Sequence, residues 1–598
     1  MRLKLSSRLT DKKTLVAVLG VVLVLLGIGS WCLLDTGIRS VLLYESPYTF
    51  QTQPGPGSQP LAERLILVLV DGLESEGAEN MLTVRDMANR GVAVRLQGHR
   101  GLAPIPASTV LMTGAPPEIS GVITNWHNAG VTIDSLWSSA SRGGLNTVIV
   151  GDSGWKPLFG DVVTRGIYRE ADDKLSNNEV NDTILKDAII EIKQGESQLM
   201  LVSFLPERRI PRSLAGSTRE GMTQEEAWAN IDMRLGDLLE AVDLSSSAVI
   251  VVLGPSHLAE NVSAGFPKNT GNTCLVAAGA GIVTPENPPP VIQWAFANPE
   301  DIAPTCASLL GISIPTHSQG EVMFSMLDMP HHTRSEVAIR QNAQRAGFFM
   351  EYMNVLGRQA NEDWSQMDAF LLHNDGDYQG AYETAQNTLG NIASALKKTR
   401  SDLVSSSRLV SIPVFVVAGI LLVSIMAMLL LDNLRSVSIA VGGVLCYFTA
   451  YYGLLLMRGV PLSSSAVLHR LELTGFYNGR IIDSIISLAF TAAFVGWLVS
   501  GRKEATKGRE GFLYGFVTFC FIAFALLAHI GIFIVTEGFA YVHYLPDMQK
   551  GFRCFMHLIQ LMVAGILSPI SAGLSEGVFV LTGHVRLSRS GQHEHLGG

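Results

Sequence analysis

An acidic side chain at the end of an apolar run is the first group in this chain that could do chemistry. Asp71 directly follows the run Arg64–Val70. A carboxylate that ends a buried strand lies at the carboxyl edge of a parallel sheet, where α/β proteins bind ligands. It can bind a divalent metal, but it can also hold a helix N-terminus or pair with an arginine such as Arg209. Any other catalytic group has to reach this edge.

A cluster of arginines is the second candidate. Arg208, Arg209 and Arg212 lie close together in a predicted loop. The planar fork of arginine suits phosphate recognition. The cluster therefore predicts a phosphate-binding site, and the alternative interpretation is a solvated basic surface.

Two ionisable residues lie near the middle of apolar stretches in the C-terminal part, namely His529 and Glu576. Ionisable groups inside a membrane are costly and commonly functional. The alternative is an interhelical hydrogen bond made by a protonated Glu576. Small residues at 564–573 favour close packing of helices.

The composition of the chain predicts the kind of protein in which these groups are placed. Only 16% of the 598 residues are charged, and the mean hydropathy is +0.28. The apolar excess lies near the N-terminus and after residue 408, which predicts a membrane protein with a soluble domain between its spans. The net charge of -9 gives no support for nucleic-acid binding. In the soluble part we expect Cys274 and Cys306 to be buried thiols rather than a disulfide.

The apolar pattern predicts six membrane spans, at 14–34, 409–431, 437–457, 481–500, 512–535 and 555–580. The basic segment 1–13 is expected in the cytoplasm, as are the basic loop 501–511 and the tail 581–598. Arg458, Arg470 and Arg480 fall on the opposite side and argue against this orientation. We expect an integral membrane protein with an extracytoplasmic main domain, in the cell membrane or in a secretory-pathway membrane of a eukaryote.

The remaining regions have distinct patterns. Residues 35–63 form a linker rich in proline and glycine, and 64–330 alternate strand-like and helix-like runs. This alternation predicts an α/β domain with a mostly parallel sheet covered by helices on both faces. Residues 331–408 predict a helical stalk, and 409–580 a five-span α-helical bundle. The sequon at Asn181 predicts glycosylation in a secretory setting.

Several ordered motifs resemble the alkaline phosphatase superfamily. They are Leu-Val-Asp71-Gly, Pro106-Ala-Ser-Thr with Gly114 after it, Ile231-Asp-Met-Arg-Leu-Gly, Leu253-Gly-Pro-Ser-His257 and Asp301-Ile-Ala-Pro-Thr. The branch most similar is type I phosphodiesterase/nucleotide pyrophosphatase, which grades into the ethanolamine-phosphate transferases of glycolipid-anchor synthesis. The resemblance covers about residues 62–325. It implies an alkaline-phosphatase-like fold and two divalent metals that activate a Thr or Ser nucleophile.

The site implied by this resemblance is only partly present. Asp71 and His257 match family metal ligands, but Leu102 stands where the family has its nucleophile. Ser108 and Thr109 lie nearby as substitute nucleophiles, or as caps of the following helix. Arg209 and Ser213 replace an expected Asp and His, and Ser256 replaces another Asp, which leaves His317 as a further ligand candidate.

These departures favour a catalytically degenerate relative with no metal. Such a protein acts by binding a partner protein, or a phosphate-bearing lipid or glycan, at the membrane. The alternative is an active phosphodiesterase or phosphoethanolamine-type transferase with a single zinc or manganese ion. A third hypothesis is that the bundle transports a solute under control of the domain.

Overall fold

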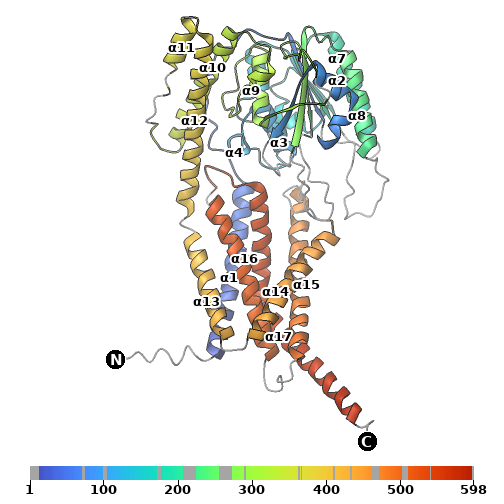
Figure 1. The fold of residues 1–598 in the computed structure, drawn as a ribbon, viewed down its shortest axis with the longest axis vertical. Helices are drawn as coiled ribbons and strands as arrows, with labels where there is room; N and C mark the ends of the chain where they lie inside the picture. Colours follow the sequence, from blue (N-terminus) through green and yellow to red (C-terminus); the bar gives the residue numbers. More distant parts are fainter. Residues whose placement is uncertain are drawn as a thin grey trace.

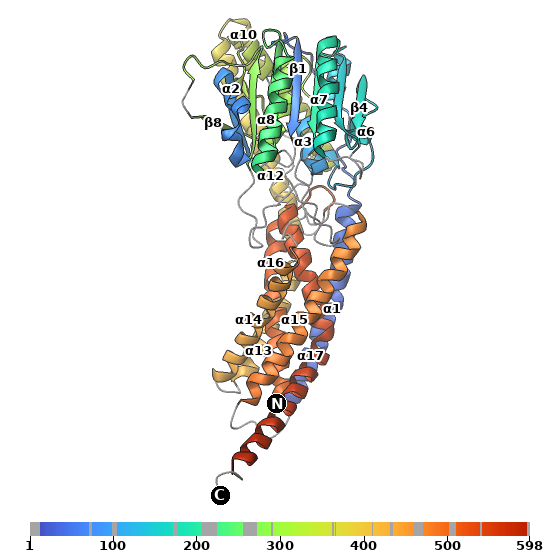
Figure 2. The same cartoon turned by 90° about the vertical axis from the view of Figure 1, so that its right-hand side faces the viewer.

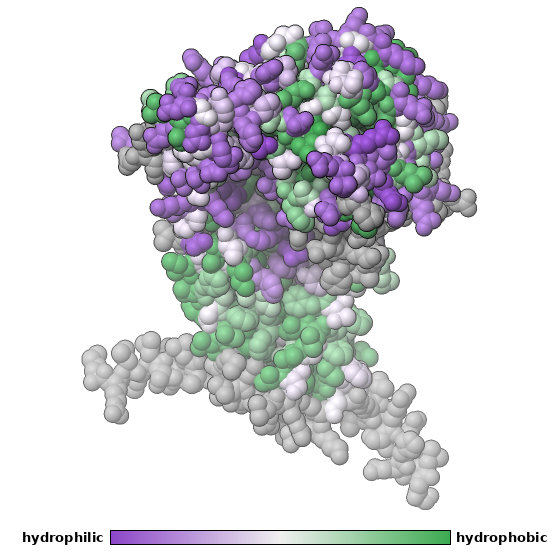
Figure 3. Space-filling view, turned by 45° about the horizontal axis from the view of Figure 1, so that its top comes forward, coloured by the Kyte–Doolittle hydropathy of each residue, from purple (hydrophilic) through white to green (hydrophobic). Residues whose placement is uncertain are grey.

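The structure is a computed structural model in which a sheet domain stands on a bundle of long helices (Figure 1). It describes residues 12–70, 75–97, 104–170, 177–205, 224–254, 272–288, 291–360, 364, 366–408, 411–430, 434–459, 470–501, 510–538 and 541–594. Hydrophilic residues cover the sheet domain and hydrophobic residues gather on the bundle (Figure 3). This division matches a membrane protein with one large domain outside the bilayer.

The sheet has eight strands in the order β4-β3-β5-β1-β6-β7-β2-β8. β7 runs antiparallel to β6 and β2, and the other pairings are parallel. The strands are β1 (Arg64–Val70), β2 (Gly91–Gln97), β3 (Thr147–Asp152), β4 (Arg165–Arg169), β5 (Leu199–Phe204), β6 (Ser247–Leu253), β7 (Asn272–Gly279) and β8 (Trp294–Ala297). The predicted mostly parallel sheet is confirmed.

Helices cover both faces of the sheet, which explains the continuous apolar run of β1. Leu65, Leu67 and Leu69 face one hydrophobic core, and Ile66, Val68 and Val70 face the other. The first core contains α3 (Pro104–Thr113), α5 (Leu136–Arg142), α6 (Trp155–Phe159) and α9 (Ile302–Leu309). The second contains α2 (Leu82–Arg90), α7 (Asn177–Gln194) and α8 (Gln224–Glu240), beside the 3-10 turn Ser75–Asn80.

The two cysteines of this domain lie on opposite faces of the sheet. Cys274 belongs to the second core and Cys306 to the first, and both are buried without a disulfide. Burial raises the pKa of each thiol to about 12. The expectation of buried core thiols is confirmed.

Residues 331–408 form more than a stalk. They fold as α10 (His331–Val355), α11 (Met367–Asn374) and α12 (Tyr378–Ser407), which stand beside the sheet domain in Figure 1. Val337, Ala369 and Ala385 join the first core. These helices therefore extend the domain, and α12 then runs down toward the bundle.

Five described helices are long and apolar enough to cross a membrane, and a sixth crossing exists if the bent pair α12 and α13 is one broken span. The bundle helices are α1 (Lys12–Leu42), α13 (Ser411–Leu430), α14 (Leu434–Met457), α15 (Arg470–Ser500), α16 (Glu510–Glu537) and α17 (Met548–Glu594). The predicted spans overlap these helices, several helices are longer, and the span predicted at 409–431 extends beyond α13 at both ends. The first candidate span runs to Val41 rather than to residue 34.

Small residues bring the bundle helices close together, as expected for 564–573. A Cβ added at Gly565 of α17 would lie 2.5 Å from the carbonyl oxygen of Leu23 and 2.8 Å from the Cα of Gly27 in α1. Backbone contact of this kind requires glycine at the crossing. Helices α1 and α17 therefore pack in direct backbone contact, although they are distant in sequence.

Candidate functional site

Several residues that the sequence analysis selected follow strands that end at the carboxyl edge of the sheet. Strands β1, β2, β5 and β6 end there, and β7 begins there because it is antiparallel. The segments that follow or join these strand ends are 71–74, 98–103, 206–223 and 255–271, which lie outside the described residues. They contain the candidates Asp71, Leu102, His257 and the arginines Arg208, Arg209 and Arg212.

Two of these segments leave from neighbouring strands. Val70, which precedes Asp71, is the partner of Leu253 in the parallel pair of β1 and β6. The backbone N–H of Gly254 donates to the Val70 carbonyl at 2.8 Å, and Gly254 has a left-handed φ of 69° that turns the chain out of the sheet. The topology thus starts the segments of Asp71 and His257 side by side.

This edge of the sheet faces the bundle. In Figure 2, β1 points toward the membrane helices, and α3 lies at the lower side of the domain. The short helix α4 (Pro117–Ser120) makes the direct contact. Glu118 accepts hydrogen bonds from Arg400 of α12 and from the backbone N–H of Leu545, at 3.1 Å and 3.3 Å.

The same helix also holds the end of the N-terminal membrane helix. The Tyr44 hydroxyl donates to the carbonyl of Glu118 at 2.8 Å, and the Ser46 hydroxyl donates to the carbonyl of Ile119 at 2.7 Å. Because the chain after α1, the helix α12 and the turn before α17 all contact α4, the sheet domain is held against the bundle at this side.

The hydroxyls that were candidate nucleophiles lie in the second turn of α3. Thr109 is fully buried, and its hydroxyl donates to the carbonyl of Ile105 at 2.9 Å. Its predicted roles as nucleophile or helix cap are therefore wrong, because the hydroxyl is occupied within the helix. The N–H of Ile105 is instead capped by the Asn125 side chain at 3.1 Å. Ser108 is half-buried on the same turn and is not at the cap position either.

One described carboxylate lies at the same edge, at the end of β3. Burial raises the pKa of Asp152, while backbone N–H groups of Gly154 and Ser153 oppose the shift. Asp152 carried no sequence signal, because its run 147–152 does not match a family motif. A raised pKa at a ligand-binding edge marks it as a candidate proton carrier.

Several motif residues turn out to stabilise the fold. Asp232 of the α8 motif caps α2 by accepting from the backbone N–H groups of Leu82 and Thr83 at 2.8 Å and 2.9 Å. Asp301 accepts from the N–H groups of Asn298 and Glu321, and burial raises its pKa to about 6.

The sequon prediction at Asn181 is wrong. Asn181 is fully buried in α7. Its side chain exchanges two hydrogen bonds with the backbone of Leu205, at 2.8 Å and 2.9 Å. The amide nitrogen is therefore inaccessible, so it does not accept a glycan.

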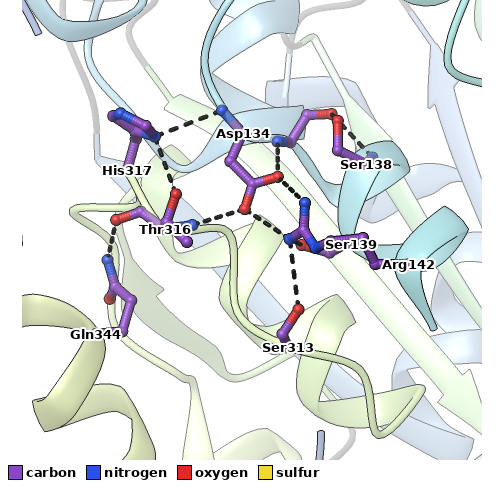
Figure 4. Close-up of polar contacts among 9 residues, drawn as sticks. Asp134, Ser138, Ser139, Arg142, Ser313, Thr316, His317 and Gln344 are labelled. Carbon is purple, nitrogen blue, oxygen red and sulfur yellow. Dashed lines mark hydrogen bonds and ion pairs between the residues drawn. The ribbon is translucent and has the colours of Figure 1, made fainter. Parts of the chain in front are cut away.

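A polar cluster joins the sheet domain to α10 (Figure 4). Asp134 accepts two hydrogen bonds from the fork of Arg142, both at 2.8 Å, and one from the backbone N–H of Thr316 at 2.9 Å. Gln344 of α10 donates to the carbonyl of Thr316 at 2.7 Å. We call Asp134, Arg142, Thr316, His317 and Gln344 the junction cluster.

His317 is the buried centre of this cluster. Its Nδ1 accepts from the N–H of Asp134 at 3.4 Å, so the ring proton is on Nε2. The ring stacks on Phe50, with centroids 5.1 Å apart. Burial lowers the pKa of His317 and outweighs the Asp134 carboxylate and nearby carbonyls of Phe50 and Tyr48, which raise it. A neutral histidine in a hydrogen-bonded junction has a structural role.

The described side chains do not form a metal site. No three His, Cys, Asp or Glu residues gather as metal ligands within the part of the chain that the structure describes. His317 has Asp134 beside it but belongs to no such group of three. The expected ligands Asp71 and His257 lie outside the described residues, and two ligands of this kind are fewer than a two-metal centre needs.

The two intramembrane candidates lie in different surroundings. His529 of α16 is exposed, and its Nδ1 donates to the carbonyl of Ala525 at 2.8 Å in its own helix. Glu576 of α17 accepts from the N–H of Phe512 at 2.9 Å, in the first turn of α16. Glu576 therefore lies beside a helix end rather than at mid-span, and the interhelical hydrogen bond expected as an alternative is present.

Comparison with known proteins identifies relatives that are distant in sequence. No protein-family model matches the chain. The human GPI ethanolamine phosphate transferase 3, catalytic subunit, is 22% identical over 413 residues, which is 60% of this chain and 37% of the human protein. The human GPI ethanolamine phosphate transferase 2, catalytic subunit, is 21% identical over 281 residues, covering 45% and 28%.

The chain is thus similar in sequence to GPI ethanolamine phosphate transferases. It spans about a third of the length of the curated relatives it matches. Two solved structures have a lower sequence identity to this chain than these relatives have. A Vibrio parahaemolyticus protein of the alkaline phosphatase superfamily covers 50% of this chain and 79% of its own at 14% identity and a TM-score of 0.33. An Agrobacterium radiobacter phosphonate monoester hydrolase covers 45% and 78% at 16% identity and a TM-score of 0.33.

The chain combines a mostly parallel α/β domain with a bundle of helices that could cross a membrane, as the sequence pattern predicted. Asp232 and Asp301, which lie in two of the motifs, make structural contacts.

Proposed function

We propose that this transferase relative binds the phosphate group of a lipid-linked glycan or phospholipid at the membrane-facing edge of its sheet, without two-metal catalysis. The observation that carries the proposal is the contact of α4 with the bundle through Glu118, Arg400 and Leu545. That contact holds the carboxyl edge beside the bilayer surface. A lipid headgroup is the phosphate-bearing ligand available there.

The residue types at this edge favour binding over catalysis. Leu102 has no nucleophilic atom where the family resemblance expects one. Arg209 stands where a metal-binding carboxylate is expected, and a cation there would repel a divalent metal. Together with Arg208 and Arg212, Arg209 supplies planar donors that suit a phosphate.

The proposed topology places both termini in the cytoplasm and the sheet domain outside it. Six crossings, with α12 and α13 as one broken span, give this arrangement. The basic segments 1–13 and 501–511 then lie on the cytoplasmic side. The proposed domain limits are 64–330 for the sheet domain, 331–408 for the helices beside it, and 409–580 for the bundle.

A second function is favoured by the sequence similarity to proteins described as catalytic subunits. In it, one zinc or manganese ion held by Asp71 and His257 would supply Lewis-acid chemistry, and Ser108 would be the nucleophile. The chain then transfers phosphoethanolamine or cleaves a phosphodiester.

Metal analysis and turnover of the purified full chain separate the two functions. The binding function predicts less than stoichiometric zinc or manganese and no hydrolysis of a chromogenic phosphodiester above that of the Asp71→Ala variant. Stoichiometric metal and activity that Asp71→Ala abolishes would establish the enzyme instead. Asp86→Ala, which changes an exposed carboxylate far from this edge, is the matched control.

A further inference from the structure

Two histidines of the bundle meet where α16 and α17 pack side by side. The rings of His529 and His557 have centroids 5.1 Å apart. Tyr452 of α14 reaches the same place, because its hydroxyl lies 3.4 Å from the Nε2 of His557. One turn before His557 in α17, Arg553 lies close enough for its charge to act on both His557 and Tyr452. We call Arg553, His557, His529 and Tyr452 the imidazole cluster.

The imidazole cluster is accessible from outside the bundle. Arg553 and His529 are exposed, and His557 and Tyr452 are half-buried. No carboxylate of the described residues pairs with Arg553. The Nδ1 of His529 donates to the Ala525 carbonyl, which leaves its Nε2 without a hydrogen-bond partner in the same part of the chain. The guanidinium and this ring nitrogen are therefore both available to a ligand.

This cluster lies near the end of the bundle that faces the sheet domain, since Leu545, between α16 and α17, contacts Glu118. α16 has 28 residues, so it is about 42 Å long and extends about 6 Å beyond each side of a hydrocarbon core of about 30 Å. The pair of Lys550 with Glu537, at 2.6 Å, holds the end of α16 level with the first turn of α17. Below that level, Arg553 lies about 5 Å deeper and the two imidazoles about 11 Å deeper, at about 1.5 Å per residue. Arg553 is therefore at the depth of the lipid headgroups, and the imidazoles lie just beneath it.

The residue types of the cluster favour an anion over a metal ion. Two imidazoles at this separation would also suit a transition metal. Arg553 carries a fixed positive charge beside them, which repels a divalent cation. No third His, Cys, Asp or Glu completes a metal-binding group in the part of the chain that the structure describes. A guanidinium, a phenol and imidazoles can all donate to phosphate oxygens, and a phosphate beside the rings favours their protonated form.

We propose that Arg553, His529 and His557 form a binding site for the phosphodiester of an anionic membrane lipid. The planar fork of Arg553 binds the phosphate oxygens at the headgroup level, in charge-assisted hydrogen bonds. The imidazoles donate to the same headgroup from below. Basic sites between membrane helices bind lipid headgroups in this way. The inference is independent of the function proposed for the sheet edge, because no residue of that edge takes part.

Lipid binding by the full chain in neutral detergent tests this inference. Short-chain dioctanoyl phosphatidylglycerol is the anionic probe, dioctanoyl phosphatidylcholine the zwitterionic one, and inorganic phosphate the free anion. Binding is measured by native mass spectrometry. We expect Arg553→Gln to weaken phosphatidylglycerol binding about tenfold or more, which corresponds to about 1.4 kcal/mol. Phosphatidylcholine binding should not change, and the melting temperature should equal that of the wild type because Arg553 is exposed.

A matched control lies near the same end of another membrane helix. Arg39 of α1 is also an exposed arginine, and it pairs with Asp35 at 2.9 Å. Arg39→Gln should leave phosphatidylglycerol binding unchanged. Equal weakening by both variants, or no weakening by Arg553→Gln, would overturn the site. Displacement of the lipid by equimolar inorganic phosphate would show that free phosphate is the ligand and would overturn the lipid assignment.

A second variant tests the imidazole without disturbing the fold. His529→Leu changes an exposed side chain that is hydrogen-bonded to its own helix, so the melting temperature should stay at the wild-type value. We expect phosphatidylglycerol binding to weaken about threefold or more. Wild-type affinity in this variant would show that the imidazole takes no part, and the proposal would fail. Zinc titration of the same two proteins completes the test, because tight zinc binding that His529→Leu abolishes would make the histidines a metal site instead.

Discussion

Two Asp–Arg clusters in this protein differ in how completely they are satisfied. In the junction cluster, Asp134 accepts from both Arg142 donors, from Thr316 and from Ser135, and the charges balance. In the bundle, the Asp483 carboxylate faces Arg480 and Arg458, and the Nε and Nη1 of Arg480 have no acceptor among the described residues. The same residue types therefore form a fully hydrogen-bonded joint in one region and a less completely hydrogen-bonded group in the other.

The largest effect should follow from breaking the junction cluster. Asp134→Ala removes four hydrogen bonds and leaves Arg142 without its carboxylate, so we expect the free energy of unfolding to fall by about 3 kcal/mol. Chemical denaturation of the full chain, followed by tryptophan fluorescence, measures it. Asp86→Ala, which breaks an exposed pair with Arg90, should cost less than about 0.5 kcal/mol. Equal losses in the two variants would show that the junction is no more than a surface ion pair.

Close packing between α1 and α17 gives the next largest effect. Gly565→Val places a side chain against the backbone of α1, so we expect a loss of about 2 kcal/mol in bundle stability. Thermal unfolding in detergent measures this loss. Gly573→Val is the control, because a Cβ there meets nothing within 4 Å. A crossing that tolerates Gly565→Val as well as Gly573→Val would refute the contact between α1 and α17.

Removing the acid between the two bundle arginines should also cost stability. Asp483→Asn leaves Arg480 buried without its carboxylate, so the melting temperature in detergent should fall. Thermal unfolding measures the fall, and Arg39→Gln, which breaks an exposed pair with Asp35, is the control. Equal melting temperatures of the two variants would show that the buried pair contributes no more than a surface pair.

The smallest effect concerns pH. Burial depresses the pKa of His317 below its ordinary 6.5, so the unfolded chain binds a proton before the folded chain does. The stability that the neutral ring contributes is therefore intact above pH 6.5 and declines as the pH falls below it, by at most about 1.4 kcal/mol per pH unit. The pH dependence of denaturation, compared between wild type and His317→Gln, isolates this term. The Asp301 carboxyl, with its pKa of about 6, has the opposite slope in both proteins. A difference between the two proteins that is flat from pH 7 to 5 would contradict a buried neutral His317.

The sequence predicted the parts of the fold that repeat a strong pattern. The fully buried strands β1, β5 and β6 read as apolar runs because helices cover both sheet faces. Strands β2, β4 and β8 were missed. The edge strands β4 and β8 are short and partly exposed, and β2 is interrupted by Arg95 and ends in Gln97, so all three lack such a run. The helices α10 to α12 read as a stalk, since polar spacing does not reveal that Val337 and Ala385 pack in the first core.

The sequence predicted the position of a site residue only where that residue directly follows a recognisable strand. Asp71 was assigned to the sheet edge because it follows β1 directly. The junction cluster was missed, since Asp134 and Thr316 are distant in sequence and belong to no common motif. The ion pair of Arg480 with Asp483 was missed, since Arg480 was interpreted only as an orientation signal and the pair becomes evident from the packing.

Photolabelling by a phosphodiester lipid tests the central claim most directly, namely that the carboxyl edge of the sheet binds a phosphate-bearing lipid beside the membrane. A lipid with a photoreactive headgroup is added to the full chain in nanodiscs, and labelled peptides are mapped by mass spectrometry. We predict labelling at the segments 71–74, 98–103, 206–223 and 255–271 that excess unlabelled lipid suppresses. No labelling is predicted at the opposite edge, for example at Glu63 or Ser245, which precede β1 and β6. Equal labelling of both edges would contradict the account.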